Sequence, residues 1–407
     1  MVKQVIYFLL AIEVLTLVHA SKLNADIPLK KHITSAQRIA SHGYPSESHN
    51  VETIDGYILN LFRIPYSPKL QNENKYRPVI LLQHGLFSCS DCYLLNGPDN
   101  ALAYILADAG YDVWLGNARG NLYSRRNSRI SIKNPFFWRF SWHEIGMFDM
   151  TAMIDYILEQ TNERALHYVG HSQGTTVFFV LMSSRPEYNA KIKTAHMLAP
   201  VAFTGNQTST TIKLASSVLG MPGLWSNLFG DQEFVPNNPI LQRLFDTACG
   251  GNVQFPKYCR NILYLYAGTD QPNINMTLLP LVAETHPAGV SSNQVLHYLQ
   301  IHKSSKFCQF DYGTKKNTNL YGQDKPPNYD LEKISAPVYM YYGDSDDSAN
   351  PLDVIRLAGI LRNLKLNHRV PNPKWGHLDF IFAQKVKEEI NDMIVKTCIE
   401  YESKVKQ

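Results

Sequence analysis

The segment that most constrains the fold has the sequence Gly-His-Ser-Gln-Gly and runs from Gly170 to Gly174. It follows an expected strand at residues 167–170 and opens an expected helix at residues 174–184. A serine between two glycines at a sharp strand-to-helix turn is the arrangement of a nucleophile elbow. The turn is so tight that side chains two residues before and after the serine would meet neighbouring backbone, which accounts for both glycines. We therefore predict that Ser172 is a nucleophile.

Short apolar runs alternate with helical patterns on both sides of this turn. This alternation is typical of a mostly parallel sheet flanked by helices, so the expected fold class is α/β. The expected strands are residues 78–83, 112–115, 167–170, 194–202, 338–342 and 367–370, and the expected helices are residues 101–109, 149–160, 174–184, 351–362 and a last one from residue 378.

The alternation stops after residue 202 and returns at residue 338. An ordinary crossover between parallel strands needs only about a dozen residues or somewhat more. Residues 203–337 are far longer than that, so we predict that they form an inserted cap domain. Residues 21–202 and 338–407 then form the α/β core that carries it.

The first 20 residues resemble a signal peptide. Lys3 precedes an apolar run at residues 5–12, Glu13 interrupts the run, and small residues at Val18 and Ala20 suit cleavage after Ala20. The run is too short to span a bilayer, which takes about 20 apolar residues. We therefore expect a protein of the secretory pathway, in the extracellular space or the lysosomal lumen, without a transmembrane segment.

The charge balance excludes one class of partner. There are 39 Lys and Arg against 35 Asp and Glu, a net charge of +4. This argues against nucleic-acid binding driven by bulk charge. Hydrophobic residues make up 44% of the chain and charged residues 18%, which excludes global disorder and provides for a large core.

Six cysteines fit an oxidising compartment. Cys249 and Cys259 lie close together in a glycine-bearing segment and could close a short ring. Cys89 and Cys92 form a lone CxxC pair; zinc would require a second pair, so either a local disulfide or two free thiols is expected. Two N-glycosylation sequons suit the same compartment and begin at Asn206 and Asn275.

A serine nucleophile needs a base, and in an α/β-hydrolase sheet the chain order is serine, acid, histidine. His377 follows the last expected strand in a loop, which is where the base must lie. His368 is the rival, but it falls within the strand pattern. Two backbone N–H groups must also hold the oxyanion. These are predicted to be those of Gln173, directly after the nucleophile, and Leu86, in the loop after strand 78–83.

The acid should follow the strand at residues 338–342. The acidic residues near this point are Asp344, Asp346, Asp347 and Asp353, and spacing alone does not choose among the first three. A calcium loop starting at Asp344 would need glycine at its sixth position and glutamate at its twelfth, but Ala349 and Ile355 stand there. No metal site is therefore expected, and the serine chemistry implies no cofactor.

Several longer motifs match one family over nearly the whole chain after residue 20. On these motifs the chain resembles the animal acid lipases, the family of gastric lipase and lysosomal acid lipase, which have the α/β-hydrolase fold. The motifs are Gly43-Tyr44-Pro45-Ser46-Glu47, Asp55-Gly56-Tyr57-Ile58-Leu59, Gln83-His84-Gly85-Leu86, residues 112–121, residues 170–176, Ala199-Pro200-Val201-Ala202 and His377-Leu378-Asp379-Phe380.

The resemblance implies roles for individual residues. Ser172 would be the nucleophile and His377 the base, with Leu86 and Gln173 as oxyanion-hole donors. Alignment of the family's acid motif on Ala349 and Pro351 favours Asp346 as the acid. The chain departs from that motif where Asp344, Ser348 and Asn350 stand, so Asp344 stays a rival. The pair Cys249 and Cys259 resembles the family's cap disulfide, and the cap would include a lid over residues 204–261.

The function implied is a serine lipase that hydrolyses triacylglycerol or sterol esters at an oil–water or membrane interface. The apolar stretch at residues 218–225, followed by Leu228 and Phe229, is either a lid edge that docks on lipid or a segment that packs on the sheet. A silent lipid carrier on a lipase fold would need no triad, and Ser172 and His377 argue against it. A soluble-ester esterase or a peptidase would use the same chemistry. Protein partners cannot be inferred.

Overall fold

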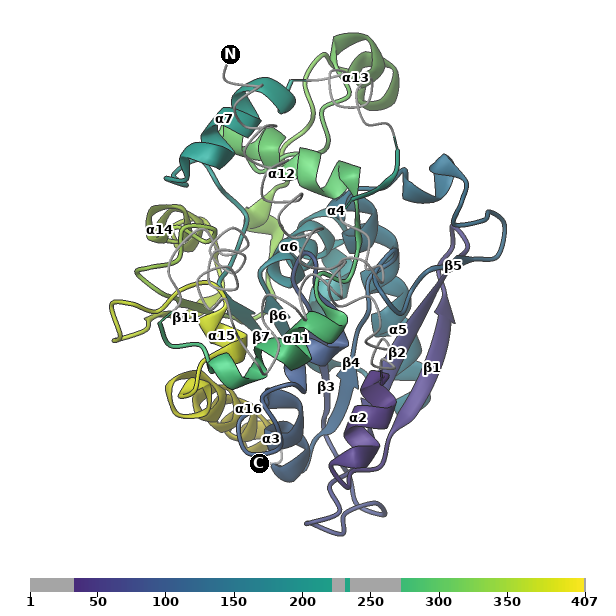
Figure 1. Ribbon diagram of the computed structural model, residues 1–407, viewed down its shortest axis with the longest axis vertical. Helices are drawn as coiled ribbons and strands as arrows, with labels where there is room; N and C mark the ends of the chain where they lie inside the picture. Colours follow the sequence, from purple (N-terminus) through teal and green to yellow (C-terminus); the bar gives the residue numbers. More distant parts are fainter. Residues whose placement is uncertain (1–32, 222–230, 235–271, 406–407) are drawn as a thin grey trace, which may run out of the picture.

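The computed structural model describes residues 33–221, 231–234 and 272–405. The predicted leader at residues 1–20, the pair Cys249 and Cys259, and most of the predicted lid lie outside the described residues. A central sheet forms the body of the molecule, with helices packed around it (Figure 1). Among the described residues, no helix is both long and apolar enough to cross a membrane.

The sheet contains eight strands along one path, with β5 (Arg126–Asn127) attached to the side of β2. Strands β4 to β11 of this path run parallel, whereas β1 pairs with β2, and β2 with β4, in antiparallel fashion. In spatial order the strands are β1 (Glu47–Glu52), β2 (Tyr57–Ile64), β4 (Asp112–Leu115), β3 (Val79–Gln83), β6 (Leu166–His171), β7 (Ile192–Leu198), β10 (Val338–Tyr342) and β11 (Leu364–Arg369).

The central strands read as continuous apolar runs because both faces of the sheet are covered. Every residue of β3, β4 and β6 is buried. Helices α3 (Leu102–Asp108), α5 (Met150–Thr161) and α6 (Gln173–Ser184) follow these strands along the chain, and α14 (Pro351–Ala358) and α16 (Asp392–Val405) follow β10 and β11. The predicted α/β-hydrolase class, with a mostly parallel sheet flanked by helices, is confirmed.

Several parts of the predicted pattern need correction. The helix predicted at 351–362 ends at Ala358, and the strand predicted at 367–370 is β11, Leu364–Arg369. The strand predicted at 194–202 ends at Leu198, because the backbone turns at Ala199, whose φ is +49°. The helix predicted from residue 378 is the short α15 (Asp379–Phe382), and α16 begins only after a π-helical turn at Lys387–Asn391. The antiparallel strands β1 and β2 and the short helix α2 (Ser35–Ser41) were not predicted, because β1 is a largely polar edge strand.

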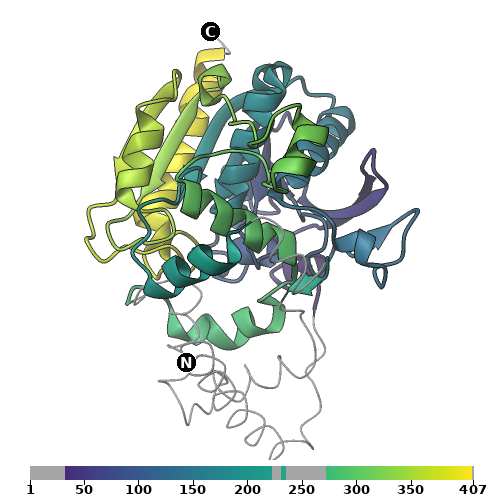
Figure 2. The ribbon, with the colours of Figure 1, turned by 90° about the horizontal axis from the view of Figure 1, so that it is seen from above.

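Between β7 and β10 the chain leaves the sheet. The described elements of this insertion are α7 (Thr210–Leu219), β8 (Glu233–Phe234), α11 (Leu279–Thr285), β9 (Val290–Ser291), α12 (Ser292–Ser304) and α13 (Thr314–Tyr321). Helix α12 packs on α7 (Figure 2), and β8 pairs with β9 in antiparallel fashion. Apolar residues of the insertion such as Ile274, Ile301 and Phe307 join the same core as the sheet. A separate cap domain over residues 203–337 stays a prediction.

Candidate active site

Ser172 stands at the turn between β6 and α6. Its φ of +52° and ψ of −116° place it in a region that non-glycine residues rarely adopt, as a nucleophile elbow requires. A Cβ on Gly170 would lie 2.7 Å from the carbonyl carbon of Gly174, and a Cβ on Gly174 would lie 2.3 Å from the carbonyl oxygen of Gln83. Both glycines are therefore required by close backbone contacts, as the sequence predicts.

His377 reaches Ser172 from the loop that follows β11. Its Nε2 lies 2.7 Å from Ser172 Oγ, a hydrogen bond in which the hydroxyl donates. The imidazole is buried, and its backbone oxygen accepts a hydrogen bond of 2.9 Å from His171 Nε2. The rival His368 lies on β11, where its ring contacts Tyr341 rather than the serine. The structure thus brings together Ser172 and His377 and leaves His368 apart.

The four acidic candidates have different partners. Asp346 is only 1% exposed, and its two oxygens lie 3.0 and 2.9 Å from His377 Nδ1. Asp344 instead forms an ion pair with Arg369 on the surface. Asp347 accepts from the backbone of Thr208 and Ser209, and Asp353 from the backbone and side chain of Asn206. Asp346 is the one of the four that meets the imidazole.

The loop after β3 approaches Ser172 closely. A Cβ on Gly85 would lie 3.1 Å from both His171 Nδ1 and Ser172 Cβ. His84 Nε2 accepts from the backbone N–H of Ala118 at 3.1 Å, so its Nδ1 carries the proton and donates to the oxygen of Gly85 at 2.8 Å. Burial lowers the pKa of His84 to about 4, which keeps this tautomer neutral. The residue that follows Gly85 is Leu86, the first predicted oxyanion donor.

Gln173, the second predicted donor, opens α6 and is buried. Its side-chain Oε1 accepts a hydrogen bond of 3.1 Å from Gln294 Nε2 on α12. The insertion therefore holds the residue that follows the nucleophile. The sequence offered no signal for this contact, because Gln294 is 121 residues away along the chain.

Together these side chains can polarise a hydroxyl and stabilise the imidazolium that forms when its proton is transferred.

A family model described as "alpha/beta hydrolase fold" matches residues 78–384, and one described as "partial alpha/beta-hydrolase lipase region" matches residues 35–97. The chain belongs to the α/β-hydrolase lipase family. The predicted resemblance to gastric and lysosomal acid lipases is confirmed by the relatives that follow.

Three curated relatives illustrate the match. Lipase 3 of Drosophila melanogaster is 45% identical over 90% of this chain and 93% of its own length. Gastric triacylglycerol lipase of Bos taurus is 40% identical over 90% of this chain and 91% of its own. Lysosomal acid lipase/cholesteryl ester hydrolase of Homo sapiens is 37% identical over 94% of both chains.

In this member of the lipase family, a second buried carboxylate lies beside the base. Asp379 Oδ2 accepts from the backbone N–H of Gly376 at 2.7 Å and from Asn273 Nδ2 at 2.8 Å, which closes the turn that carries His377. Burial raises the pKa of Asp379 to about 6. Sequence reasoning assigned it no role, although it stands in the motif His377-Leu378-Asp379-Phe380.

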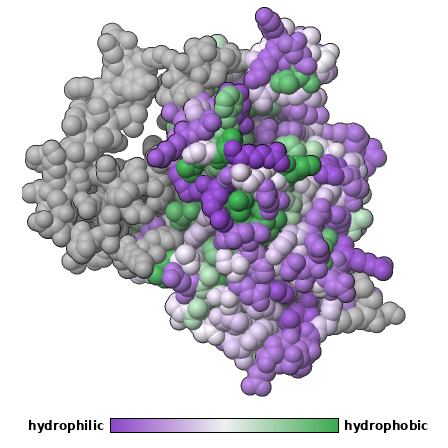
Figure 3. All heavy atoms as spheres, turned by 90° about the vertical axis from the view of Figure 1, so that its right-hand side faces the viewer, coloured by the Kyte–Doolittle hydropathy of each residue, from purple (hydrophilic) through white to green (hydrophobic). Residues whose placement is uncertain are grey.

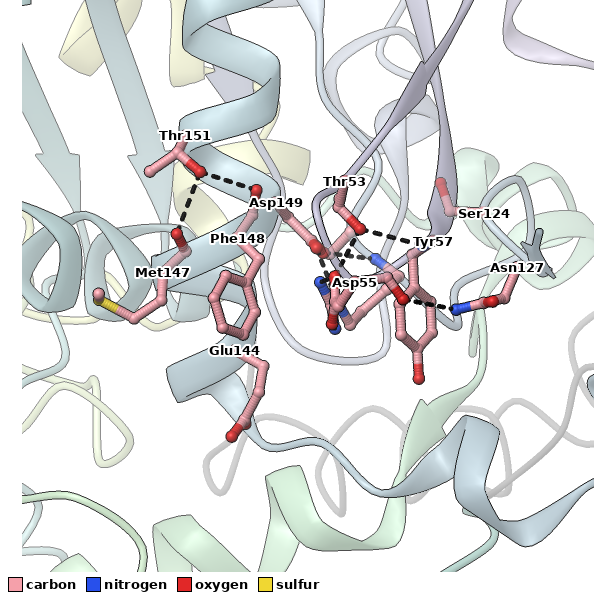
Figure 4. A network of polar contacts seen from close by, with 12 residues as sticks. Thr53, Asp55, Tyr57, Ser124, Asn127, Glu144, Met147, Phe148, Asp149 and Thr151 are labelled. Atoms are coloured by element: carbon pink, nitrogen blue, oxygen red, sulfur yellow. Dashed lines mark hydrogen bonds and ion pairs between the residues drawn. The ribbon is translucent and has the colours of Figure 1, made fainter. Parts of the chain in front are cut away.

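A buried ionic cluster supports the loop that holds His84. Arg119 donates to Asp55 through Nη1 and Nη2 at 2.6 and 2.9 Å, to Asp149 through Nε at 2.6 Å, and stacks 3.9 Å from the ring of Tyr57. Figure 4 shows Asp55 and Asp149 converging from different elements. Burial raises the pKa of Asp149 to about 6, although Arg119 opposes the shift. Because Ala118 precedes Arg119, the cluster also fixes the N–H that bonds His84.

The remaining predicted positions are the CxxC cysteines and the two sequon asparagines. Cys89 and Cys92 are buried free thiols, so the second of the two alternatives for this pair is correct. Asn206 is exposed, and its Nδ2 donates to Asp353, while Asn275 Oδ1 accepts from the backbone N–H of Thr277. Glycosylation at either asparagine stays a prediction. Within the described ranges, no cluster of three or more His, Cys, Asp or Glu side chains could hold a metal ion.

Proposed function

We propose that this protein is a serine lipase that hydrolyses carboxylic esters of neutral lipids, triacylglycerols or sterol esters, through an acyl-enzyme. The observation that carries the proposal is the continuous contact from Ser172 Oγ to His377 Nε2 at 2.7 Å and from His377 Nδ1 to Asp346. The names of the bovine and human relatives, a triacylglycerol lipase and a cholesteryl ester hydrolase, support the substrate class.

The proposed mechanism begins with a proton transfer. His377 Nε2 takes the proton of Ser172 as the oxygen attacks the ester carbonyl, and the carbonyl oxygen becomes an oxyanion held by the N–H groups of Leu86 and Gln173. Asp346 keeps the other proton on Nδ1 and stabilises the imidazolium. Collapse of the intermediate expels the alcohol, which receives the proton from Nε2, and leaves an acyl-serine.

Water completes the cycle. His377 accepts a proton from water, the hydroxide attacks the acyl carbonyl, and the fatty acid leaves as Ser172 regains its proton. No cofactor takes part in the proposed mechanism. Loss of one oxyanion donor typically costs about 10²–10³ in kcat. These two donors are main-chain N–H groups, which side-chain substitution does not remove.

We place the protein in the secretory pathway, in the extracellular space or the lysosomal lumen. The expected leader at residues 1–20 and the names of the gastric and lysosomal relatives support this location. A disulfide between Cys249 and Cys259 and glycans on Asn206 and Asn275 belong to the same proposal. Mass spectrometry of protein secreted from insect or mammalian cells tests all three modifications together with the site of leader cleavage.

The activity is tested with two substrates. Emulsified long-chain triacylglycerol and a soluble short-chain ester are compared from acid to neutral pH, for the wild type and Ser172→Ala. We expect hydrolysis of the emulsion that disappears in the variant. Hydrolysis of the soluble ester alone would make the protein an esterase. A folded wild type that hydrolyses neither substrate would contradict the proposal and favour a lipid carrier.

A further inference from the structure

The loop at residues 125–139 is unusually basic. No Asp or Glu occurs between Asp112 and Glu144, whereas this loop alone contains Arg125, Arg126, Arg129, Lys133 and Arg139. It runs beside the β1–β2 turn, because β5 pairs with β2 and the N–H of Ser128 donates to the oxygen of Gly56. The two segments project together from the right-hand side of the body in Figure 1. A strongly cationic feature thus stands out from the sheet.

Two of these cations are neutralised and three are not. Arg125 forms an ion pair with Glu233, and Arg139 one with Asp231, both at 2.6 Å. Arg126 instead donates to the amide of Asn50 and Arg129 to the backbone oxygen of Ile54. Among the described residues no carboxylate pairs with Arg126, Arg129 or Lys133, and all three are exposed. The carboxylate of Glu52 lies nearby, accepting from Ser128, which leaves an excess of positive charge.

Large apolar side chains are exposed among these cations. Ile54, at the tip of the β1–β2 turn, is 79% exposed, and Phe136 is 57% exposed. The Arg139 guanidinium stacks 4.3 Å from the Phe136 ring, so apolar and cationic groups lie directly together. Figure 3, which faces this side of the molecule, shows apolar spots enclosed by hydrophilic residues. We call Ile54, Arg126, Arg129, Lys133 and Phe136 the loop patch.

Contacts connect the loop patch to the proposed site. Arg125 holds Glu233 of β8, and the next residue, Phe234, lies 6.1 Å from the ring of Phe87. Phe87 directly follows Leu86, the proposed oxyanion donor. The patch therefore lies on the side of the molecule from which β8 approaches the loop that would hold the oxyanion. A surface seated on the patch would therefore lie next to β8, which contacts that loop through Phe234 and Phe87.

We propose that the loop patch docks the protein on a lipid–water interface that carries anionic headgroups. This inference rests on the proposed function, since it names the surface on which that function takes place. Guanidinium groups bind phosphate oxygens in a bidentate manner, and exposed Ile and Phe side chains enter the boundary between headgroups and acyl chains. Each cation near an anionic lipid surface strengthens binding by about fivefold.

The test measures binding to vesicles by flotation. All variants are made in the Ser172→Ala background, so that no lipid is hydrolysed. The vesicles are phosphatidylcholine alone, or equal parts of phosphatidylcholine and phosphatidylserine. The triple variant Arg126→Gln, Arg129→Gln, Lys133→Gln is expected to bind the anionic vesicles roughly a hundredfold more weakly, with little change on phosphatidylcholine. Added salt should weaken the wild type more than the variant.

A matched control removes the same charge elsewhere. Lys303→Gln, Lys315→Gln and Lys325→Gln neutralise three exposed lysines on and around α12 and α13, and this triple variant is expected to bind like the parent. Equal losses in both triple variants, or no loss in the first, would overturn the proposal. So would a wild type that binds heparin beads but neither kind of vesicle, because the occupant would then be a polyanionic glycan.

Two further measurements separate docking from folding and from catalysis. With Ser172 restored, the loop-patch triple variant should hydrolyse a soluble ester at the wild-type rate. If that rate falls, the variant Phe136→Ser tests docking without a change of charge. Binding to both kinds of vesicle that is about tenfold weaker supports docking by the loop patch, and unchanged binding overturns the proposal. Because flotation needs no turnover, a protein that floats with vesicles but hydrolyses no ester contradicts the proposed function and leaves the docking surface standing.

Discussion

Two aspartates that stand two residues apart, Asp344 and Asp346, meet different surroundings. Asp346 is buried against His377 Nδ1, whereas Asp344 pairs with Arg369 at the surface. Asp346→Asn should lower kcat by about 10⁴ with little change in KM, because an amide no longer holds the required tautomer or stabilises the imidazolium. Asp344→Asn is the matched control and should stay within a few-fold of wild type. Steady-state kinetics on a soluble ester measure both, and equal losses would reopen the choice of acid.

Position 174 requires glycine because there is no room for a side chain, and not because of its backbone conformation. A Cβ there would lie 2.3 Å from the carbonyl oxygen of Gln83 in the centre of the sheet, and backbone in this position cannot move aside. Gly174→Ala should therefore lower the free energy of unfolding by about 3 kcal/mol, measured by urea denaturation. At Gly359, whose φ is −70°, a Cβ would meet no atom closer than 3.5 Å. Gly359→Ala should leave stability unchanged or raise it by about 0.4–1 kcal/mol.

At the level of elements, α16 is joined to the sheet by a buried polar cluster. Glu402 on α16 accepts from His167 Nε2 on β6 at 3.1 Å and from Lys193 Nζ on β7 at 2.8 Å. Burial opposes ionisation, but these hydrogen bonds prevail and lower the pKa of Glu402 to about 2. The stabilisation is therefore fully present above pH 4.5, the pKa of an unperturbed glutamate, and is lost as the pH falls towards 2.

Glu402→Gln tests this attachment. At pH 7 it should lower the free energy of unfolding by about 2 kcal/mol, since the side chain is only 11% exposed. The difference from wild type should shrink as the pH falls below 4.5. The exposed Glu400→Gln on the same helix should change stability by no more than about 0.5 kcal/mol. A Glu402→Gln difference that is independent of pH would mean that the negative charge of Glu402 does not contribute to the attachment.

The elements that the sequence predicted well are those whose burial is uniform. Strands 112–115 and 338–342 were predicted with the boundaries that β4 and β10 have, because a parallel strand covered on both faces is a nearly continuous run of apolar and aromatic residues. Strand β1 lies at the edge and was missed for the opposite reason. Spacing also identified Ser172 and His377, but the acid depends on which aspartate the fold turns inward. Contacts such as Gln294 with Gln173 leave no local pattern in the sequence.

For the whole molecule, buried titratable groups of two kinds act in opposite directions on acid stability. Burial lowers the pKa of His84 and His286 to about 4 and of His171 and His196 to about 3. The unfolded chain protonates these imidazoles near pH 6.5, before the folded chain does, so their contribution to stability declines as the pH falls below 6.5. The buried carboxyls Asp149 and Asp379, with a pKa of about 6, do the reverse.

Between about pH 6 and pH 4 the four histidines outweigh the two carboxyls. At these groups the unfolded state then binds more protons than the folded state, so the free energy of unfolding falls as the pH falls. His196→Gln removes one of the four histidines. The free energy of unfolding should then fall less steeply with falling pH, by about 1.4 kcal/mol per pH unit. Asp379→Asn removes a carboxyl that takes up its proton on folding, and should make the decline steeper by a similar amount.

Urea denaturation of the three proteins at half-unit steps of about pH 4–7 measures these slopes. The two variants are expected to change the pH slope in opposite directions, which distinguishes this effect from a general loss of packing. Such a loss would lower the stability of both variants by an amount independent of pH. Parallel curves for the wild type and both variants would show that these buried groups do not govern the acid response. Curves that diverge in opposite directions would assign the acid response to the buried neutral histidines and to the buried carboxyl of Asp379 in the turn that carries His377.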